Sequence, residues 1–104
     1  MNFEYHEKDD IAVFEYRDYE EYERSIDVAN FVVDLDSEDC FLGLEIIGAS
    51  ERLPLTKKEL SSIEDVEVVV TDDEESKMIT ITLKREEKET SLNLPVKSIT
   101  GQPA

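Results

Sequence analysis

The chain has 104 residues, the length of one domain with one modest hydrophobic core. Its 27 acidic and 11 basic side chains give a formal net charge of −16, which would repel nucleic-acid phosphates and anionic membranes. A single cysteine, Cys40, excludes an intramolecular disulfide and a cysteine-based metal site; its neighbours Phe41 and Leu42 suggest a core position. The N-terminal segment is acidic, and no apolar run reaches membrane-spanning length, so we expect one monomeric, cytoplasmic domain over residues 1–104.

The first half of the chain predicts short strands separated by polar turns. In chain order these are the stretch from Phe3 to Tyr5, "IAVFEYR" (11–17), "SIDVA" (25–29), "FVVDL" (31–35) and "CFLGLEIIG" (40–48). The first two of them predict a hairpin across "HEKDD" (6–10). Between them and the rest, "DYEEYER" (18–24) fits either a helical turn or an ordered loop, since tyrosines recur every three residues.

The second half contains one helix start with a clear mechanism. In "LTKKEL" (55–60), Thr56 can cap the helix while Glu59 reaches back, which is a capping box and predicts a short helix at about 57–63. Three strands are then predicted: "VEVVVT" (66–71) as a buried strand, "MITITLK" (78–84) and "TSLNLPV" (90–96). Pro95 lacks a ladder donor and therefore predicts an edge strand.

These elements follow one another through short acidic turns, which implies antiparallel pairing. We expect an α+β fold, a mainly antiparallel sheet of about seven strands (seven or eight β-rich runs) with one or two short helices.

Two stretches also match known patterns. "YHEKDDIAVF" (5–14) has Tyr5 and Asp10 where the pattern Y-D-x-x-x-D-x-L-x-I has its tyrosine and second aspartate, with His6 in place of the first. "GLEIIGAS" (43–50) follows G-x-E-I-L-x-A-S at Gly43, Glu45, Ile46, Ala49 and Ser50, and departs from it at Gly48.

Over residues 1–53 the chain therefore resembles a widespread archaeal and bacterial family of domains of unknown function. The whole chain resembles conserved hypothetical proteins of methanogenic archaea. The resemblance implies a small, β-rich, antiparallel domain and no known activity.

The acidic stretch "DLDSED" (34–39) has two interpretations. As a calcium loop, it would place Asp34, Asp36 and Glu38 at positions 1, 3 and 5 of an EF-hand and Glu45 at position 12. The glycine required at position 6 is replaced by Asp39, and the flanks read as strands, so a hairpin turn is the competing interpretation.

A second acidic stretch, "DDEES" (72–76), raises the same question. Its four consecutive carboxylates repel one another, and a bound divalent cation would relieve that repulsion. The alternative is that these acids protect the edges of the neighbouring strands from pairing with other chains.

Catalysis has little support in the sequence. His6 is the only histidine, which excludes a site built on several, and a surface histidine at a strand end competes with a general base beside Glu7 and Asp10. There is no glycine-rich phosphate loop. We therefore expect no enzymatic activity.

Our leading hypothesis is weak binding of a divalent cation, Ca²⁺, through the acidic loops. The candidate ligands are, first, Asp72, Asp73, Glu74 and Glu75 and, second, Asp34, Asp36, Glu38 and Asp39. The alternative is a protein-interaction module whose acidic face docks a basic partner. In that case Tyr16, Tyr19 and Tyr22 would be anchors, unless they only cover the edge of the core.

Overall fold

The computed structural model describes residues 1–73, 76–97 and 99. Within them the chain forms eight strands, two short α-helices and one 3-10 turn. The strands are β1 (Asn2–His6), β2 (Ile11–Glu15), β3 (Tyr22–Val28), β4 (Phe31–Asp36), β5 (Phe41–Ile47), β6 (Asp65–Asp72), β7 (Lys77–Arg85) and β8 (Lys88–Pro95). The helical elements are η1 (Tyr19–Glu21), α1 (Ala49–Arg52) and α2 (Lys57–Leu60).

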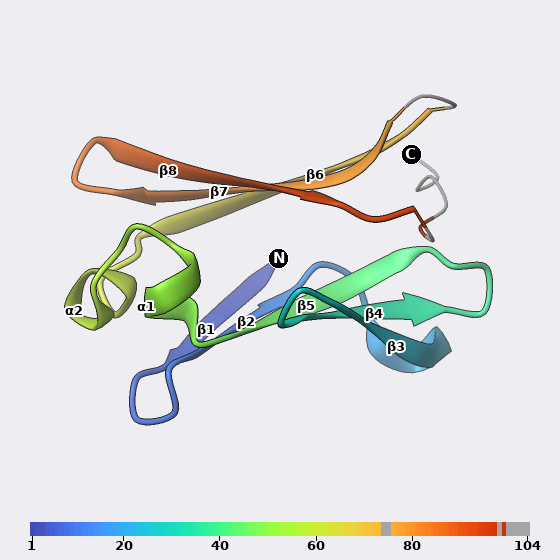
Figure 1. Ribbon diagram of the computed structural model, residues 1–104, viewed down its shortest axis with the longest axis horizontal. Coiled ribbons are helices and arrows are strands. Elements are labelled where there is room, and N and C mark those ends of the chain that lie inside the picture. The colour runs from blue at the N-terminus through green and yellow to red at the C-terminus, as the bar shows by residue number, and fades with distance from the viewer. Residues whose placement is uncertain (74–75, 98, 100–104) are drawn as a thin grey trace.

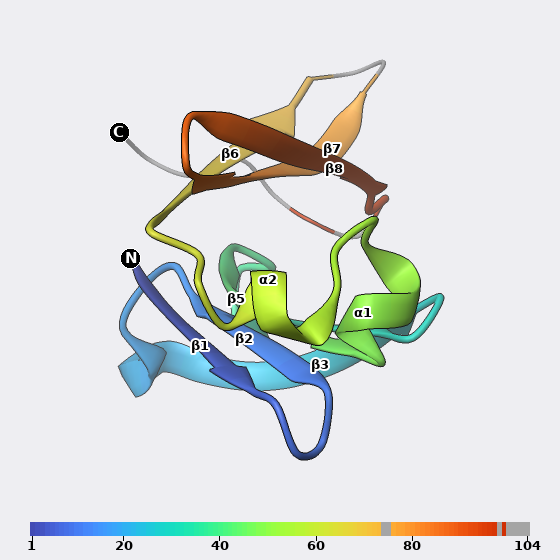
Figure 2. The same ribbon diagram turned by 90° about the vertical axis from the view of Figure 1, so that its left-hand side faces the viewer.

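The strands pair into two antiparallel sheets, with the order β1-β2-β5-β4-β3 in one and β6-β7-β8 in the other. Figure 1 shows the sheets as two layers, with α1 and α2 at one end between them, and Figure 2 shows the same end facing the viewer. The expected antiparallel pairing and the presence of short helices are confirmed. The described strands number eight instead of about seven, and they form two sheets where the sequence suggested one, because alternation locates a strand without naming its partner.

The core lies between the two sheets. Phe14, Leu44 and Val33 are neighbours across β2, β5 and β4, and all three are completely buried. Ile79 and Ile81 of β7 belong to the same cluster from the opposite layer. Side chains alternate across a strand, so the residues between Phe14, Leu44 and Val33 lie on the outer face of the five-stranded sheet. That outer face carries the candidate site.

Strand β6 corrects one expectation. It was expected to be buried, but it is an edge strand of the three-stranded sheet, and the side chain of Val69 is 48% exposed. Val66, Val68 and Val70 are partly buried and pack against the core from the other face. The edge position expected from Pro95 is confirmed, since β8 is the opposite edge.

The capping box of α2 is present as predicted. Glu59 N donates to Thr56 Oγ1 at 3.1 Å, and Thr56 N donates to Glu59 Oε1 at 3.0 Å. The α-helix ends at Leu60, earlier than the expected residue 63, where Ser61 and Ser62 hydroxyls bond back to helical carbonyls.

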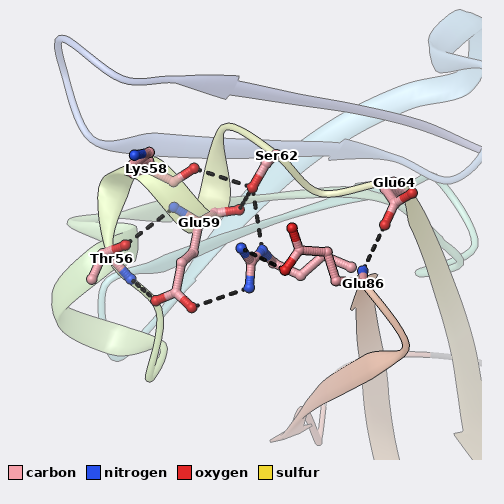
Figure 3. A network of polar contacts seen from close by, with 7 residues as sticks. Thr56, Lys58, Glu59, Ser62, Glu64 and Glu86 are labelled. Carbon is pink, nitrogen blue, oxygen red and sulfur yellow. Dashed lines mark hydrogen bonds and ion pairs between the residues drawn. The ribbon is translucent and has the colours of Figure 1, made fainter.

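The same glutamate ties α2 to β7. Arg85 Nη1 lies 3.2 Å from Glu59 Oε2, and Arg85 Nε donates to Ser62 Oγ at 3.2 Å (Figure 3). The hydrogen bonds from Thr56 and the guanidinium of Arg85 lower the pKa of Glu59. This network fixes the helical end of the molecule to the three-stranded sheet.

A second set of contacts closes the first hairpin onto α1. Asp10, at a φ of 55°, accepts hydrogen bonds from Tyr5 Oη at 2.6 Å, Ser50 N at 3.0 Å and Ser50 Oγ at 2.7 Å. Its carbonyl oxygen also accepts from Ala49 N at 2.9 Å. These residues are among those on which the family resemblance rests, and here they hold backbone segments together.

Cys40 is 6% exposed, as its apolar neighbours predicted, and burial raises the pKa of its thiol. None of the helices in the described part of the chain is long and apolar enough to cross a membrane.

Candidate functional site

The topology brings a loop across the outer face of the five-stranded sheet. β2 and β3 are not neighbours, so the chain between them must pass β5 and β4. Two consecutive amides, Tyr16 N and Arg17 N, donate to Leu42 O at 2.8 and 2.9 Å and start this crossing. Asp18 then caps η1 by accepting from Glu20 N at 3.1 Å. The segment 18–24, open between helix and loop from sequence, is a 3-10 turn followed by the start of β3.

The side chain of Tyr19 lies over Gly43 of β5. A Cβ atom at position 43 would overlap the Tyr19 hydroxyl oxygen and would lie 2.6 Å from the carbonyl oxygen of Phe14. Glycine in a strand interior often marks a close approach of another group, and here that group is the tyrosine ring. The absence of a side chain at Gly43 is what lets Tyr19 reach the sheet.

The hydroxyl of Tyr19 donates a hydrogen bond to a buried carboxylate. Tyr19 Oη donates to Asp34 Oδ2 at 2.6 Å, and Ser25 Oγ donates to Asp34 Oδ1 at 2.6 Å. Asp34 is 8% exposed although it lies on the outer face of the sheet, because η1 covers it. The Tyr22 and Ser25 hydroxyls lie 2.7 Å apart, and the Tyr22 ring stacks on that of Tyr19 with centroids 6.0 Å apart. Together these residues form a wall in which both carboxylate oxygens of Asp34 accept hydrogen bonds.

A cleft of about 600 Å³ opens beside this wall. Glu15, Glu45, Asp34 and Asp18 contribute carboxylates to its lining, and Arg17 contributes the one basic side chain. Desolvation, the hydrogen bond to Asp34 and the negative charges of Asp34, Glu15 and Glu45 raise the pKa of Tyr19, which keeps its hydroxyl protonated as a donor.

Glu15 and Glu45 differ from the other acids of the cleft. Glu15 pairs with Gly43, and Glu45 pairs with Val13, so the two glutamates are diagonal neighbours on adjacent strands. Within the described residues, no hydrogen bond or ion pair engages either carboxylate. Asp34, by contrast, has both oxygens occupied. The cleft therefore presents two carboxylates that are available to a cationic ligand.

Arg17 contacts an aromatic ring. Its Cζ lies 5.7 Å from the ring centroid of Tyr16, another lining residue, in a cation–π arrangement. The Tyr16 ring is itself held against Phe41, with centroids 5.4 Å apart. The Tyr16 ring thus packs against the core, and the Arg17 guanidinium lies over it.

The stretch 34–39 is a hairpin turn between β4 and β5. Asp36 Oδ1 accepts from Glu38 N at 2.8 Å and Cys40 N at 2.9 Å, and Asp39 forms an ion pair with Arg24 at 2.6 Å. Asp34 points away from this turn, toward Tyr19 and Ser25. Its candidate ligands, which are Asp34, Asp36, Glu38 and Asp39, are therefore not brought together.

The second candidate metal loop is described only in part. Asp72 Oδ1 lies 3.0 Å from Lys77 Nζ, and Asp73 Oδ1 accepts from Ser76 N at 2.6 Å. Glu74 and Glu75 lie outside the described residues. Among residues 1–73, 76–97 and 99, no three His, Cys, Asp or Glu side chains are grouped so that they could hold a metal ion. Calcium binding stays a prediction.

His6 lies at the end of β1 with its side chain 51% exposed, and its Nε2 is 3.5 Å from Glu4 Oε2. Sequence reasoning singled out the three tyrosines, considered Glu45 only as a calcium ligand and a motif residue, and missed Glu15 and the role of Gly43. The glycine within a predicted strand was the one available signal of a close approach. The partners across the sheet could not be read from the sequence.

Comparisons with known proteins give one similarity. No family model matches the chain, and no solved structure matches it. A protein of Methanosarcina mazei named "Putative hypoxanthine phosphoribosyltransferase" is 30% identical over 70 residues, which are 67% of this chain and 57% of that protein. The match thus spans little more than half of that relative's length. The resemblance to a family of domains of unknown function stays a prediction.

Proposed function

We propose that this protein is a non-catalytic interaction module that docks a basic protein partner through the cleft beside Tyr19. The observation that carries the proposal is the pair of unengaged carboxylates, Glu15 and Glu45, beside a tyrosine wall in a cleft of about 600 Å³. A cationic side chain placed there would gain two charge-assisted contacts and an aromatic surface.

The charge of the whole molecule supports a basic partner. A net charge of −16 produces a long-range negative potential that accelerates the approach of a positively charged protein. Such steering weakens with salt, whereas contacts inside the cleft are less exposed to screening. Tyrosines are enriched at protein interfaces, and Tyr22, beside the cleft wall, is 47% exposed.

The charge of the cleft also bears on catalysis. A phosphoribosyl group, named in the relative of M. mazei, carries phosphate, and phosphate sites are built from backbone N–H groups, lysine or arginine. The lining of this cleft has the opposite sign, with four carboxylates against the one guanidinium of Arg17. This supports binding of cations rather than of phosphorylated substrates.

The test is a titration of the ¹⁵N-labelled protein with a peptide of alternating lysine and glycine, beside a matched peptide of alternating glutamate and glycine. We expect saturable amide shifts around Glu15, Gly43 and Glu45 with the lysine peptide alone, and weaker binding at higher salt. Absence of binding at low salt, or shifts spread evenly over all acidic surfaces, would refute the proposal.

A further inference from the structure

We propose that the free edge of β6 is a second docking surface, on which an extended segment of a basic partner protein adds as a further antiparallel strand. The segment would place apolar side chains toward the core and basic side chains on the outer face of the three-stranded sheet. This inference goes beyond the proposed function, because β6 belongs to the other sheet and none of its residues lines the cleft beside Tyr19.

β6 is the least protected of the four edge strands in the described part of the chain. β1 has only five residues, β3 shifts its register between Tyr22 and Arg24, and β8 carries Pro95. β6 runs for eight residues in unbroken register with β7 and contains neither a proline nor a bulge. Short strands, bulges and prolines are the usual features that keep an edge from pairing further. β6 is therefore the edge most open to an added strand.

The hydrogen bonds of β6 show which of its backbone groups are unpaired. Asp73 N donates to Ser76 O at 3.0 Å, in register with the pairing of β6 and β7. Bonded and non-bonded residues alternate along an antiparallel pair, so the odd-numbered residues of β6 bond to β7 and the even-numbered residues face the free edge. Val66 N, on that edge, already donates to a side-chain oxygen. The N–H and C=O groups of Val68 and Val70 face outward, and no described strand lies beyond them.

A cavity of about 420 Å³ opens where this edge meets β1. Four apolar side chains contribute to its lining: Met1, Phe3, Ile63 and Val66. Figure 2 shows β1 and β6 on the same side of the molecule, one in each layer. The inward-facing valines of β6 are only partly buried there, and the side chain of Met1 is 50% exposed. Apolar side chains of an added strand would extend this inner face and enter the cavity, which removes more apolar surface from water.

The charges along this edge indicate a basic occupant. Glu64 and Asp65 complete the lining of the cavity, and the described residues that line it include no basic one. Glu67 is exposed on the outer face of β6. A residue added opposite Glu67 would have its Cβ about 4.5–5.5 Å away, so a lysine or arginine there could form an ion pair. A second copy of the chain fits less well, because it would bring another molecule of net charge −16 against the same acids.

The probe is a short peptide of alternating valine and lysine with blocked ends, in two N-methylated forms. Methylation of the valine amides removes the donors that would face Val68 and Val70, whereas methylation of the lysine amides alters only the edge that faces solvent. We expect the valine-methylated peptide to bind at least about tenfold more weakly than the lysine-methylated one, because two backbone hydrogen bonds are lost. Equal affinities for the two forms would refute strand addition.

Hydrogen exchange locates the bound peptide. In the free protein, the amides of Val68 and Val70 should exchange faster than the amide of Val69, which bonds to β7. The lysine-methylated peptide, at about ten times its Kd, should slow exchange at both valines about tenfold. The lysine–glycine peptide lacks the apolar side chains and should leave exchange at these valines nearly unchanged, so the proposals for the cleft and for β6 can fail separately.

Two outcomes of the exchange experiment would overturn the proposal. Amides of Val68 and Val70 that exchange as slowly as that of Val69 in the free protein would show that the edge is already covered. A dimer in analytical ultracentrifugation under the same conditions would then identify the occupant as a second copy of the chain and not a basic partner.

Matched variants test the charge of the occupant. Glu67→Gln should weaken binding of the lysine-methylated peptide about two- to fivefold, the size of one exposed ion pair. Glu89→Gln removes the same charge from β8, the opposite edge of the same sheet, and should change the affinity less. Equal losses in the two variants would mean a general attraction to the acidic surface and would overturn docking of a basic strand at β6.

Discussion

Replacing Gly43 with alanine tests the construction of the cleft wall directly. The new Cβ would overlap the hydroxyl oxygen of Tyr19 and lie 2.6 Å from the carbonyl oxygen of Phe14, in the next strand. The tyrosine can swing away, but the strand carbonyl cannot. Tyr19 therefore leaves the sheet, and buried Asp34 loses one of its two hydrogen-bond donors.

The expected decrease in the free energy of unfolding has two contributions, the lost hydrogen bond and the inserted methyl group. A hydrogen bond to a charged group contributes about 1.5–3 kcal/mol to the free energy of unfolding. Inserting a methyl group into closely packed structure costs about 1–3 kcal/mol more. Together, Gly43→Ala should lower the free energy of unfolding by about 3–5 kcal/mol, a large share of the 5–15 kcal/mol of a typical domain. Each kcal/mol should lower Tm by roughly 4–8 °C for a domain of this size.

Urea denaturation of the wild type, Gly43→Ala, Tyr19→Ala and the double variant measures how much of the destabilisation by Gly43→Ala is due to the contact with Tyr19. Without the tyrosine, only the contact with the Phe14 carbonyl remains, so Gly43→Ala should cost at least about 1 kcal/mol less in the Tyr19→Ala background. Tyr19→Phe isolates the hydroxyl and should cost about 1.5–3 kcal/mol. Strictly additive costs, or a cost of Gly43→Ala below about 1 kcal/mol, would show that the ring does not lie on Gly43.

Three further predictions concern the contacts of Asp10, the network around Glu59 and Arg85, and the acidic loop at 72–75. Partial burial raises the pKa of Asp10, but the hydrogen bonds from Tyr5 and Ser50 outweigh it and the net pKa is lowered. Asp10→Asn should therefore lower the free energy of unfolding by about 2 kcal/mol at neutral pH. This difference between the variant and the wild type should vanish as the pH falls below about 4, through the pKa of Asp10 in the folded state. A difference in stability that persists at low pH would refute the charge-based explanation. Arg85→Gln should lower the free energy of unfolding by about 1–2 kcal/mol, because it removes the hydrogen bonds between Arg85 and Ser62 and Glu59. Lys84→Gln, which breaks only an exposed ion pair with Glu89 at 3.9 Å, is the control and should leave the free energy of unfolding almost unchanged in urea denaturation. If calcium binds at 72–75, CaCl₂ should give saturable amide shifts at Asp72 and Asp73 and raise Tm, and shifts that MgCl₂ or matched NaCl reproduces would exclude a specific site.

Local signals in the sequence predicted the strands and α2 but not α1. Alternation located the strands, the capping box located α2, and Pro95 placed β8 at an edge. Each of these signals acts within a few residues of chain. The turn between β7 and β8 gave no such signal, because its positive φ angles of 46° and 64° fall on Glu86 and Glu87, where Asn-Gly is the usual choice.

The candidate site depended on pairings that local signals do not carry. Tyr19 meets Gly43 and Asp34 because β5 and β4 lie between β2 and β3 in the sheet, and no spacing in the sequence reports that order. At 34–39 the sequence suggested a grouping of carboxylates that the structure does not contain. Its carboxylates are adjacent in sequence, yet the alternation of β4 and the turn at Asp36 direct Asp34 and Asp39 to different partners, Tyr19 and Arg24.

The residues that carry the family resemblance divide by their role in the structure. The side chains of Tyr5, Asp10 and Ser50 hydrogen-bond to one another and hold the first hairpin against α1, so their role is structural and implies no shared ligand. Gly43 and Glu45 belong to the cleft, the first by admitting Tyr19 and the second by its unengaged carboxylate. Asp10→Asn should accordingly reduce stability and leave the affinity for the lysine–glycine peptide unchanged in the folded protein, whereas Glu45→Gln should weaken binding of that peptide and leave stability unchanged. If both variants weakened binding equally, the contacts of Asp10 and the cleft would be one functional unit, and the division between them would be wrong.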